Sequence, residues 1–412
     1  MTIGNQARFA LKFPWKCRWM LKITTLMKTP RVAVLALLVH LAGPLGALAQ
    51  GSLVPPGAPA PMMKTLQQIE PRAPISAVPF LITNSGSYYL TTNLVGTSGH
   101  GIIISNSDVT VDLGGFVLRG GAGNGIIVPV LCSNVWVRNG TVRDWGLTGV
   151  SNSLAAASGV ENVSSVNNGR DGISIGTGAV VRACVVISSG ARGILAGPNS
   201  LVESCTVSDS GASSSISVGS RSQVLNCVVS QNPGTDGIIT GAGSRVVGCI
   251  SSANSRGIFL GNDCLVENCV VEGNSSIGIR TFNNNVVRNC LVRNNGNDGI
   301  FAVGHNLLVG NMCHGNGTNV TTGGAGIHMV AGGGNGTHIE GNSVHNNSWG
   351  IRVGTTNNII IRNTASMNDT NYFIVTSNKV GVIIASPFSG AISGSTGGTG
   401  VGTTDPWANL SF

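Results

Sequence analysis

The chain has 412 residues, of which 60 are glycine and only 10% are charged, well under the share in ordinary soluble proteins. Hydrophobic residues make up 42%, which excludes a wholly disordered chain, and the glycines follow no Gly-X-Y period, which excludes collagen. The formal net charge of +8 raises the question of a nucleic-acid partner.

The first 49 residues have the composition of a secretory leader. Seven basic and no acidic residues lie in residues 1–31, and an apolar run from Val32 to Leu48 follows. The run ends in small residues at Ala49, and this order predicts a signal peptide over residues 1–49. A transmembrane anchor is the alternative, but the run is short for a membrane span. We therefore expect export to the periplasm, the cell surface or the medium, with no membrane anchor after cleavage.

The net charge falls almost to zero behind this leader. Seven of the 24 basic residues lie in it, which leaves 17 basic against 16 acidic residues, a net charge of +1. A nearly neutral chain lacks the electrostatic signature of a nucleic-acid-binding protein, so we expect no nucleic-acid partner. Residues 50–76 are rich in proline and are predicted to form a linker.

A Gly-Ile step recurs at intervals of 20 to 27 residues from Gly101 to Gly350 and predicts a solenoid. Short β-branched segments separate the steps, helical periodicity is absent, and the leucine framework of leucine-rich repeats is missing. Three short strands per repeat predict an all-β fold, a single-stranded right-handed parallel β-helix of about 12–13 coils. We place it at residues 77–385, with an N-terminal cap at residues 79–94 and a Gly/Ser/Thr-rich C-terminal strap at residues 386–412.

Cysteine is the second repeated feature. One position, twelve residues after its step, holds Cys184, Cys205, Cys227, Cys249, Cys269 and Cys290. Our alignment places Val163 in this slot before the cysteines and Asn311, Asn342 and Asn363 after them. Metal binding would call for C-x-x-C pairs or histidine companions, which are absent, so the slot predicts an inward stack of small buried side chains. The spacing of neighbouring strands disfavours disulfides along the stack.

Charged residues follow an outward column two residues before the cysteine slot. The signs alternate through Asp112, Arg138, Glu161 and Arg182. Opposite charges on adjacent strands stabilise a sheet, whereas a catalytic carboxylate pair would place two acids together. The column therefore predicts a structural ion ladder.

The outward position after each step gives the best candidate for a binding surface. From the fifth coil it reads Leu195, Ser217, Ile239, Phe259, Arg280, Phe301, His328 and Arg352. Aromatic rings stack on sugars and arginine binds carboxylates, so the last five residues are the candidate ligand-binding face for a carbohydrate or polyanion. The alternative is that these side chains lie under a loop or are ordinary scattered surface residues.

Two histidines are candidate metal ligands. His314 and His345 occupy equivalent positions in adjacent coils, with Met312 or His338 near them in the sequence. The alternative is a solvated column, since earlier coils hold Glu272 and Arg293 there. No nucleophile–base motif or phosphate loop occurs. No cofactor is indicated, although the sequence does not exclude a bound calcium or copper ion.

The coils resemble a known family of repeats. Asp171-Gly-Ile-Ser-Ile and Val287-Arg-Asn-Cys290 are similar to the right-handed parallel β-helix repeats of the pectate-lyase-like superfamily, of the NosD-like, carbohydrate-binding and sugar-hydrolase type. Segments 86–94, 108–116 and 404–409 resemble secreted β-helix proteins of planctomycete and verrucomicrobial bacteria. The resemblance covers about residues 75–412.

The resemblance implies candidate roles for a few residues. Pectate and alginate lyases of this superfamily use calcium-binding acid clusters with an Arg or Lys base, and polygalacturonases use paired aspartates. Neither motif occurs here, and Arg280, between Phe259 and Phe301 in the column, is the one candidate for a lyase-like base. The copper role of NosD-like proteins would fall to His314 and His345.

Three functions follow as hypotheses. The first is an exported β-helix that binds polysaccharide or serves as a cell-surface structural or interaction module, with no catalysis assumed. The second is a polysaccharide lyase or epimerase acting on uronate polymers, and the third is a periplasmic metal-handling protein. The sequence leaves catalysis, the ligand and the oligomeric state open.

Overall fold

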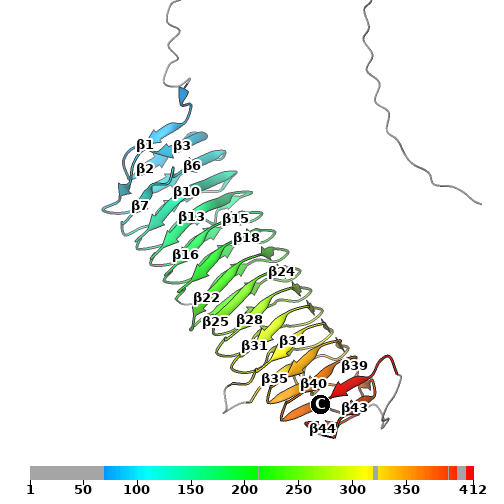
Figure 1. Ribbon diagram of the computed structural model, residues 1–412. Coiled ribbons are helices and arrows are strands. Elements are labelled where there is room, and N and C mark those ends of the chain that lie inside the picture. The colour runs from blue at the N-terminus through cyan, green and yellow to red at the C-terminus, as the bar shows by residue number, and fades with distance from the viewer. Residues whose placement is uncertain (1–68, 212, 319–322, 388, 397–404) are drawn as a thin grey trace, which may run out of the picture. The chain divides into compact units, whose positions relative to one another are not determined.

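The described part of the protein is an elongated β-solenoid (Figure 1). The computed structural model describes residues 69–211, 213–318, 323–387, 389–396 and 405–412. The predicted signal peptide and residues 50–68 of the predicted linker lie outside them. Every element assigned from Ala73 onward is a β-strand, and among the described residues no helix is long and apolar enough to cross a bilayer.

Each turn of the solenoid contributes strands to three faces, and all pairing between turns is parallel. Face 1 is a sheet of 15 strands, whereas faces 2 and 3 join into a sheet of 28 strands. The strands of face 1 are β2 (Phe80–Ile82), β5 (Ile102–Ile104), β8 (Ile126–Ile127), β11 (Val150–Asn152), β14 (Ile173–Ile175), β17 (Ile194–Ala196), β20 (Ser214–Val218), β23 (Asp236–Thr240), β26 (Ile258–Phe259), β29 (Ile279–Arg280), β32 (Ile300–Ala302), β35 (Ala325–Met329), β38 (Trp349–Val353), β41 (Thr370–Ile374) and β44 (Ala391–Gly394).

Faces 2 and 3 share the long strands β10 (Val135–Arg143) and β13 (Gly159–Val166). The other strands of face 2 are β1 (Ala73–Ile75), β3 (Gly86–Leu90), β6 (Val109–Asp112), β15 (Val180–Arg182), β18 (Leu201–Glu203), β21 (Gln223–Leu225), β24 (Arg245–Val247), β27 (Leu265–Glu267), β30 (Val286–Arg288), β33 (Leu307–Val309), β36 (His338–Glu340), β39 (Ile359–Ile361) and β42 (Lys379–Val380). Those of face 3 are β4 (Leu94–Val95), β7 (Val117–Arg119), β16 (Val185–Ile187), β19 (Thr206–Ser208), β22 (Val228–Asn232), β25 (Ile250–Asn254), β28 (Val270–Glu272), β31 (Leu291–Arg293), β34 (Met312–His314), β37 (Ser343–His345), β40 (Thr364–Ser366), β45 (Asn409–Ser411) and β43 (Ile383–Ala385). The short strands β9 (Cys132–Ser133) and β12 (Ala155–Ala156) pair with each other.

The predicted parallel β-helix is confirmed, and it has about 14 turns. The count exceeds the predicted 12–13 because strands continue the coil where the Gly-Ile step is missing. At the N-terminal end β2 pairs with β5, and at the other end β41 pairs with β38, with Asn371 in the position of the step glycine.

The corner between faces 2 and 3 explains the abundance of Asn, Gly and Ser in the repeat. One residue per coil has a left-handed backbone there, including Asn226, Asn268 and Asn289 with φ between 52° and 54°. Asparagine and glycine tolerate that region far better than β-branched residues do. The strand therefore bends at a defined residue, and the next side chain points inward.

That inward residue is the cysteine slot, and its predicted role is confirmed. The register aligns Val163 with Cys184 and continues through the six cysteines to Asn311. All nine described cysteines are buried and free of disulfides. Each ladder thiol lies 3.3–3.5 Å from the carbonyl oxygen two residues before it. The thiol therefore donates a hydrogen bond to a backbone carbonyl at the bend between faces 2 and 3.

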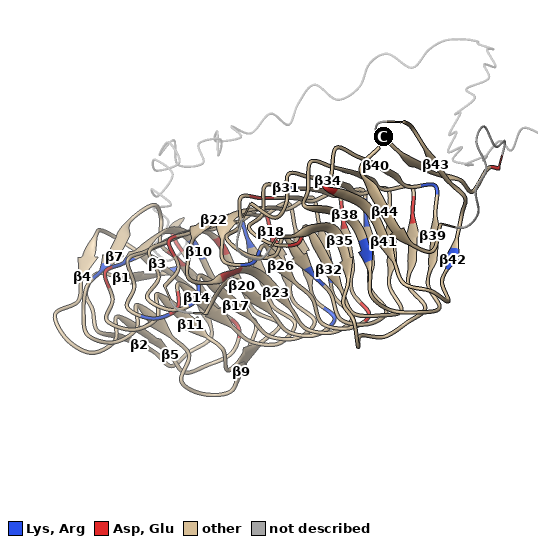
Figure 2. Ribbon diagram, turned by 90° about the horizontal axis from the view of Figure 1, so that it is seen from below, with Lys and Arg blue, Asp and Glu red and all other residues tan. Residues whose placement is uncertain are grey.

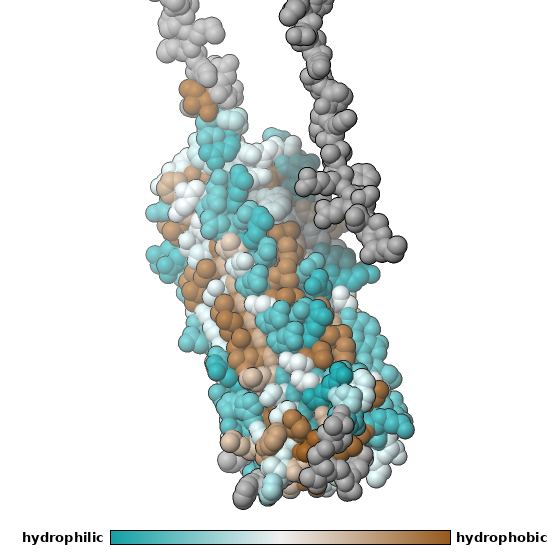
Figure 3. Space-filling model, turned by 45° about the vertical axis from the view of Figure 1, so that its right-hand side comes forward, coloured by the Kyte–Doolittle hydropathy of each residue, from teal (hydrophilic) through white to brown (hydrophobic). Residues whose placement is uncertain are grey.

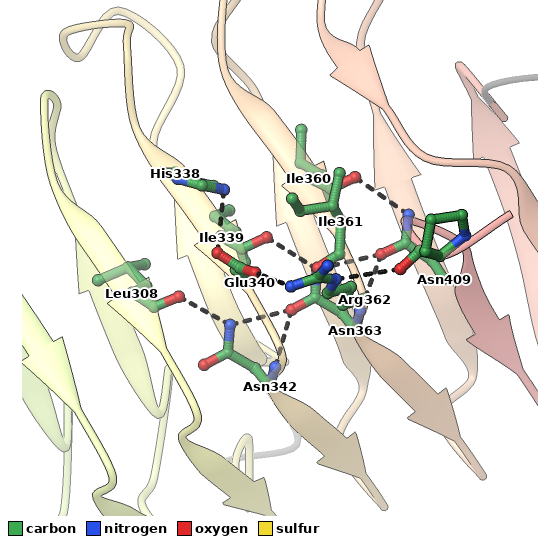
Figure 4. A network of polar contacts seen from close by, with 11 residues as sticks. Leu308, His338, Ile339, Glu340, Asn342, Ile360, Ile361, Arg362, Asn363 and Asn409 are labelled. Atoms are coloured by element: carbon green, nitrogen blue, oxygen red, sulfur yellow. Dashed lines mark hydrogen bonds and ion pairs between the residues drawn. The ribbon is translucent and has the colours of Figure 1, made fainter. Parts of the chain in front are cut away.

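Asparagines continue the slot towards the C-terminus and form a hydrogen-bonded ladder (Figure 4). The Oδ1 atom of Asn363 accepts hydrogen bonds from the backbone N and from Nδ2 of Asn342, both at 2.9 Å. The Nδ2 group of Asn363 donates to the Ile339 carbonyl at 2.9 Å and to Asn409 Oδ1 at 3.1 Å. Each amide therefore ties its own coil to the coils on both sides.

Charges on the outer surface of face 2 are arranged as predicted. Register partners run from Asp112 through Arg138 to Glu161 and Arg182. Arg182 lies 2.8 Å from Glu161, and Arg288 lies 2.9 Å from Glu267. The ion ladder is confirmed, and Figure 2 shows short red and blue segments spread along the solenoid instead of one charged patch.

Apolar residues form a line on the outer surface of face 3. Val185, Ile250 and Met312, with exposed fractions of 39%, 39% and 46%, belong to one in-register column. Figure 3 shows hydrophobic residues following the length of the solenoid in broken lines. The outer surface of the fold is thus organised in columns, each with its own chemistry.

The C-terminal strand breaks the sequential order of the coils. Strand β45 lies between β40 and β43 and pairs with both. Tyr372 is buried beneath it and donates a hydrogen bond to the Leu410 carbonyl at 2.9 Å. Burial raises the pKa of the Tyr372 hydroxyl, which stays a proton donor.

Candidate functional site

The five predicted face residues form one column on the outer surface of face 1. The register pairs Phe259 with Arg280, Arg280 with Phe301, Phe301 with His328 and His328 with Arg352. The column ends on Phe373, which pairs with Arg352. All six side chains are half-buried. One residue per coil projects outward because the strands are parallel and in register.

The ring of Phe259 lies between two guanidinium groups. The Cζ atom of Arg256 is 4.6 Å from the ring centroid, and that of Arg280 is 5.1 Å from it. Arg256 also binds Asp236 through two hydrogen bonds of 2.6 Å, so its charge is balanced. Phe282 packs edge-on against Phe259, with ring centroids 5.5 Å apart. The result is a cation–aromatic cluster that spans three coils.

A hollow of about 460 Å³ opens beside this cluster. Its lining includes Asp236, Arg256, Arg280 and the residues Thr235 and Ser276 from neighbouring turns. Guanidinium, carboxylate and hydroxyl groups therefore surround one depression next to an aromatic ring. This combination can hydrogen-bond the hydroxyl and carboxylate groups of a sugar.

A histidine–aspartate pair lies further along the same face. Nδ1 of His328 is 3.0 Å from Oδ2 of Asp298, and both side chains are largely shielded from solvent. The imidazole also packs edge-on against Phe301, with ring centroids 5.4 Å apart. With Nδ1 engaged by the carboxylate, Nε2 is the ring nitrogen that can exchange a proton.

A second cation–aromatic cluster closes the column. Arg352 lies 5.2 Å from the Trp349 ring centroid, and Trp349 packs edge-on against Phe373 at 5.6 Å. Trp349 occupies the position directly before the Gly-Ile step, which we call the turn column. Earlier coils hold Asp298 and Ala325 at this position. The outward and turn columns together thus build this part of the face.

The predicted set lacks Phe373, which extends the column by one coil, and four contributors from outside the column: Arg256, Phe282, Asp298 and Trp349. Arg256, Asp298 and Trp349 belong to the turn column, which the sequence places beside the outward column in every coil. Aligning both columns one coil apart would have brought Asp298 next to His328. Phe282 follows its strand, where the repeat gives no side-chain direction.

The candidate metal ligands are adjacent but incomplete. His314 and His345 pair in register, with ring centroids 4.7 Å apart. Burial, and secondarily the neighbouring His314, lowers the pKa of His345. The described residues contain no group of three or more His, Cys, Asp or Glu side chains that could hold a metal ion.

Comparisons with known proteins concern the fold. A family model described as a right handed beta helix region matches residues 176–316. No curated protein sequence matches the chain significantly. Among solved structures, the chain is similar to the A-module of a mannuronan C-5 epimerase of Azotobacter vinelandii, with 14% identity, coverage of 76% of this chain and 91% of that chain, and a TM-score of 0.51.

Two further structures match less closely. A periplasmic alginate epimerase has 12% identity, coverage of 60% of this chain and 72% of that chain, and a TM-score of 0.41. A double mutant of the tailspike protein of E. coli bacteriophage HK620, in complex with a pentasaccharide, has 13% identity, coverage of 79% and 71%, and a TM-score of 0.45. The family model and the first of these structures both support a right-handed parallel β-solenoid fold.

Proposed function

We propose that this protein is an exported polysaccharide-binding β-helix that uses the column from Phe259 to Phe373 on face 1. One observation carries the proposal: aromatic and cationic side chains stand in register on six consecutive coils, with their rings and guanidinium groups in contact. A flat parallel sheet presents them at intervals of about 4.8 Å.

The spacing of the aromatic rings supports an extended ligand. Phe259 and Phe301 are two coils apart, which is about 10 Å, and the whole column spans about 24 Å. Rings held by edge-on packing and cation–π contacts offer pre-organised platforms for the apolar faces of sugars. A polymer of pyranose rings lying along the solenoid axis would meet several of them at once.

Removing two of the aromatic rings in the column should weaken glycan binding. We expect the double substitution Phe259→Ala with Phe301→Ala to lower affinity for a retained glycan by about 10- to 100-fold, because each ring contributes on the order of 1 kcal/mol. Titration calorimetry on a polysaccharide first identified by screening would measure the change. Ile359→Ala on face 2, where that side chain is 42% exposed, is the control and should bind like the parent. Equal affinity of all three proteins would reject the proposal.

A second candidate function is a lyase or epimerase acting on uronate polymers. The His328–Asp298 pair favours it, because the aspartate orients the imidazole and stabilises its protonated form. Arg352 is one coil from His328 and could offset the charge of a uronate carboxylate, which acidifies the neighbouring C5 proton. His328 would take that proton. In a lyase the C4–O bond then breaks, a C4–C5 double bond forms and the leaving oxygen is protonated by water; in an epimerase water returns a proton to C5 from the opposite side of the ring.

Incubation with uronate polymers, with and without calcium, tests this second candidate. A lyase gives ultraviolet absorbance from unsaturated products, and an epimerase changes the uronate composition in NMR spectra. We expect His328→Ala to abolish turnover while glycan retention persists. Full activity in His328→Ala would exclude the histidine as base, and the absence of any product from the parent protein leaves binding as the function.

A further inference from the structure

Two arginines on face 1 have no carboxylate partner. Neighbouring cations are paired: Arg192 with Asp171 at 3.2 Å, Arg256 with Asp236 at 2.6 Å, and His328 with Asp298 at 3.0 Å. Among the described residues, neither Arg280 nor Arg352 makes an ion pair. The face therefore carries two positive charges without an ion-pair partner. Arg170, Arg221, Arg245 and Lys379 also make no ion pair among the described residues, but Arg280 and Arg352 are the two that lie in the aromatic column of face 1.

Arg280 is held in place without an anion. Its Cζ atom lies 5.1, 5.5 and 5.7 Å from the ring centroids of Phe259, Phe282 and Phe301. Its Nε atom is shielded from solvent and has no hydrogen-bond partner in the protein. Cation–π contacts offset part of the desolvation of a guanidinium, but an unsatisfied donor remains unfavourable. An anion bound in the adjoining hollow of about 460 Å³, which Arg280 lines, would supply the charge partner that this guanidinium lacks.

Arg352 repeats this arrangement at the other end of the column. It lies against Trp349 at 5.2 Å, in a cluster completed by Phe373. Three strand spacings separate Arg280 from Arg352, through Phe301 and His328, which gives about 14 Å. The Asp298–His328 pair between them adds no net positive charge while the histidine is neutral. The face thus presents two separate positive points.

We propose that face 1 selects an acidic oligosaccharide with two anionic groups about 14 Å apart, one bound by Arg280 and the other by Arg352. This inference rests on the proposed polysaccharide binding. It adds the chemical class of the ligand, its minimum length and its alignment along the solenoid axis. A sugar ring is about as long as one strand spacing, so a chain along the solenoid axis needs about four sugars to reach both arginines. Shorter acidic sugars reach one arginine only.

The test compares uronate oligosaccharides of two to six sugars by titration calorimetry with the full chain. We expect affinity to rise by about tenfold or more between two and four sugars and then to level off, because both charges are engaged at about that length. Arg280→Gln and Arg352→Gln should each remove that gain and lower the dependence on salt. Arg280→Lys keeps a charge and serves as the check that the fold survives, and Arg245→Gln on face 2 is the matched control.

The arms of this experiment separate the outcomes. If a sulfated oligosaccharide of the same length binds and its affinity depends on both arginines, the bound anion is sulfate and the proposal is supported. Carboxyl-reduced oligosaccharides that bind as tightly as the uronates overturn it, while the proposed polysaccharide binding stands. Tighter binding of an oligothymidylate overturns it as well, in favour of nucleic acid. A failure of every glycan to bind removes both proposals.

Discussion

The substitution Asn363→Leu is expected to destabilise the protein by about 3–5 kcal/mol. Asn363 is fully buried, and its side chain bonds Asn342 on one side and Asn409 on the other. Leucine has similar bulk but removes the acceptor of the buried Asn342 backbone N–H, and the Asn342 side-chain amide keeps only its bond to the Leu308 carbonyl. The Ile339 carbonyl loses the hydrogen bond from Asn363 Nδ2. Each unsatisfied buried group costs about 1–3 kcal/mol, so the loss exceeds that of most single substitutions.

Urea unfolding followed by circular dichroism measures this change, and hydrogen exchange shows whether the last coils open first. Cys249→Val is the matched control because it changes the same slot in the middle of the solenoid, where an earlier coil carries Val163. Its thiol makes only long contacts, 3.5 Å to each of two carbonyl oxygens, so we expect a loss below about 1.5 kcal/mol. A smaller effect for Asn363→Leu than for Cys249→Val would mean that the ladder contributes little.

The substitution Gly278→Ala is expected to cost about 2–3 kcal/mol for a steric reason. A Cβ atom at Gly278 would lie 2.6 Å from the Gly299 carbonyl oxygen, 2.6 Å from Val292 Cγ1 and 2.8 Å from Asn295 Nδ2. One of these contacts is to the backbone of the next coil, which can give way only by shifting that coil. Gly278 is therefore needed for the close stacking of its own coil on the next one, whereas other coils hold Ser215 and Asn371 at this position.

Ser215 occupies the same column and provides the control for Gly278. Its hydroxyl is buried and has no hydrogen-bond partner in the protein. Replacing it with glycine removes that group but adds chain entropy to the unfolded state, so we expect the stability to stay within about 1 kcal/mol. Thermal melting of both variants compares them directly. A melting temperature of Gly278→Ala equal to that of the parent protein would show that the coils can separate without cost.

The repeat made most of the fold predictable because every coil places its inward and outward residues at the same positions. Registered columns such as the cysteine slot and the Asp112–Arg138 ion ladder follow directly once the period is known. The predicted span of residues 77–385 includes β41, but the predicted number of coils was too low because this coil has no glycine step and carries Asn371 in its place.

The candidate site was predictable along its column but not across it. The order Phe259, Arg280, Phe301 follows from the period alone, since parallel strands in register bring equivalent residues together. The contact between Asp298 and His328 joins two columns one coil apart, so it follows only when both columns are aligned together. The contact between Phe282 and Phe259 involves a residue outside both columns, and the repeat gives no direction for it.

The position of β45 bears on how the protein matures. Because β45 lies between β40 and β43, the end of the solenoid can close only after residue 411 has been made and delivered. Until then both neighbouring strands present an unpaired edge, the feature that promotes association between chains. The coils can fold in order from the N-terminal side, whereas the pairing of β45 with β40 and β43 comes last. A chain that is cut short before β45 would therefore be left with an open end.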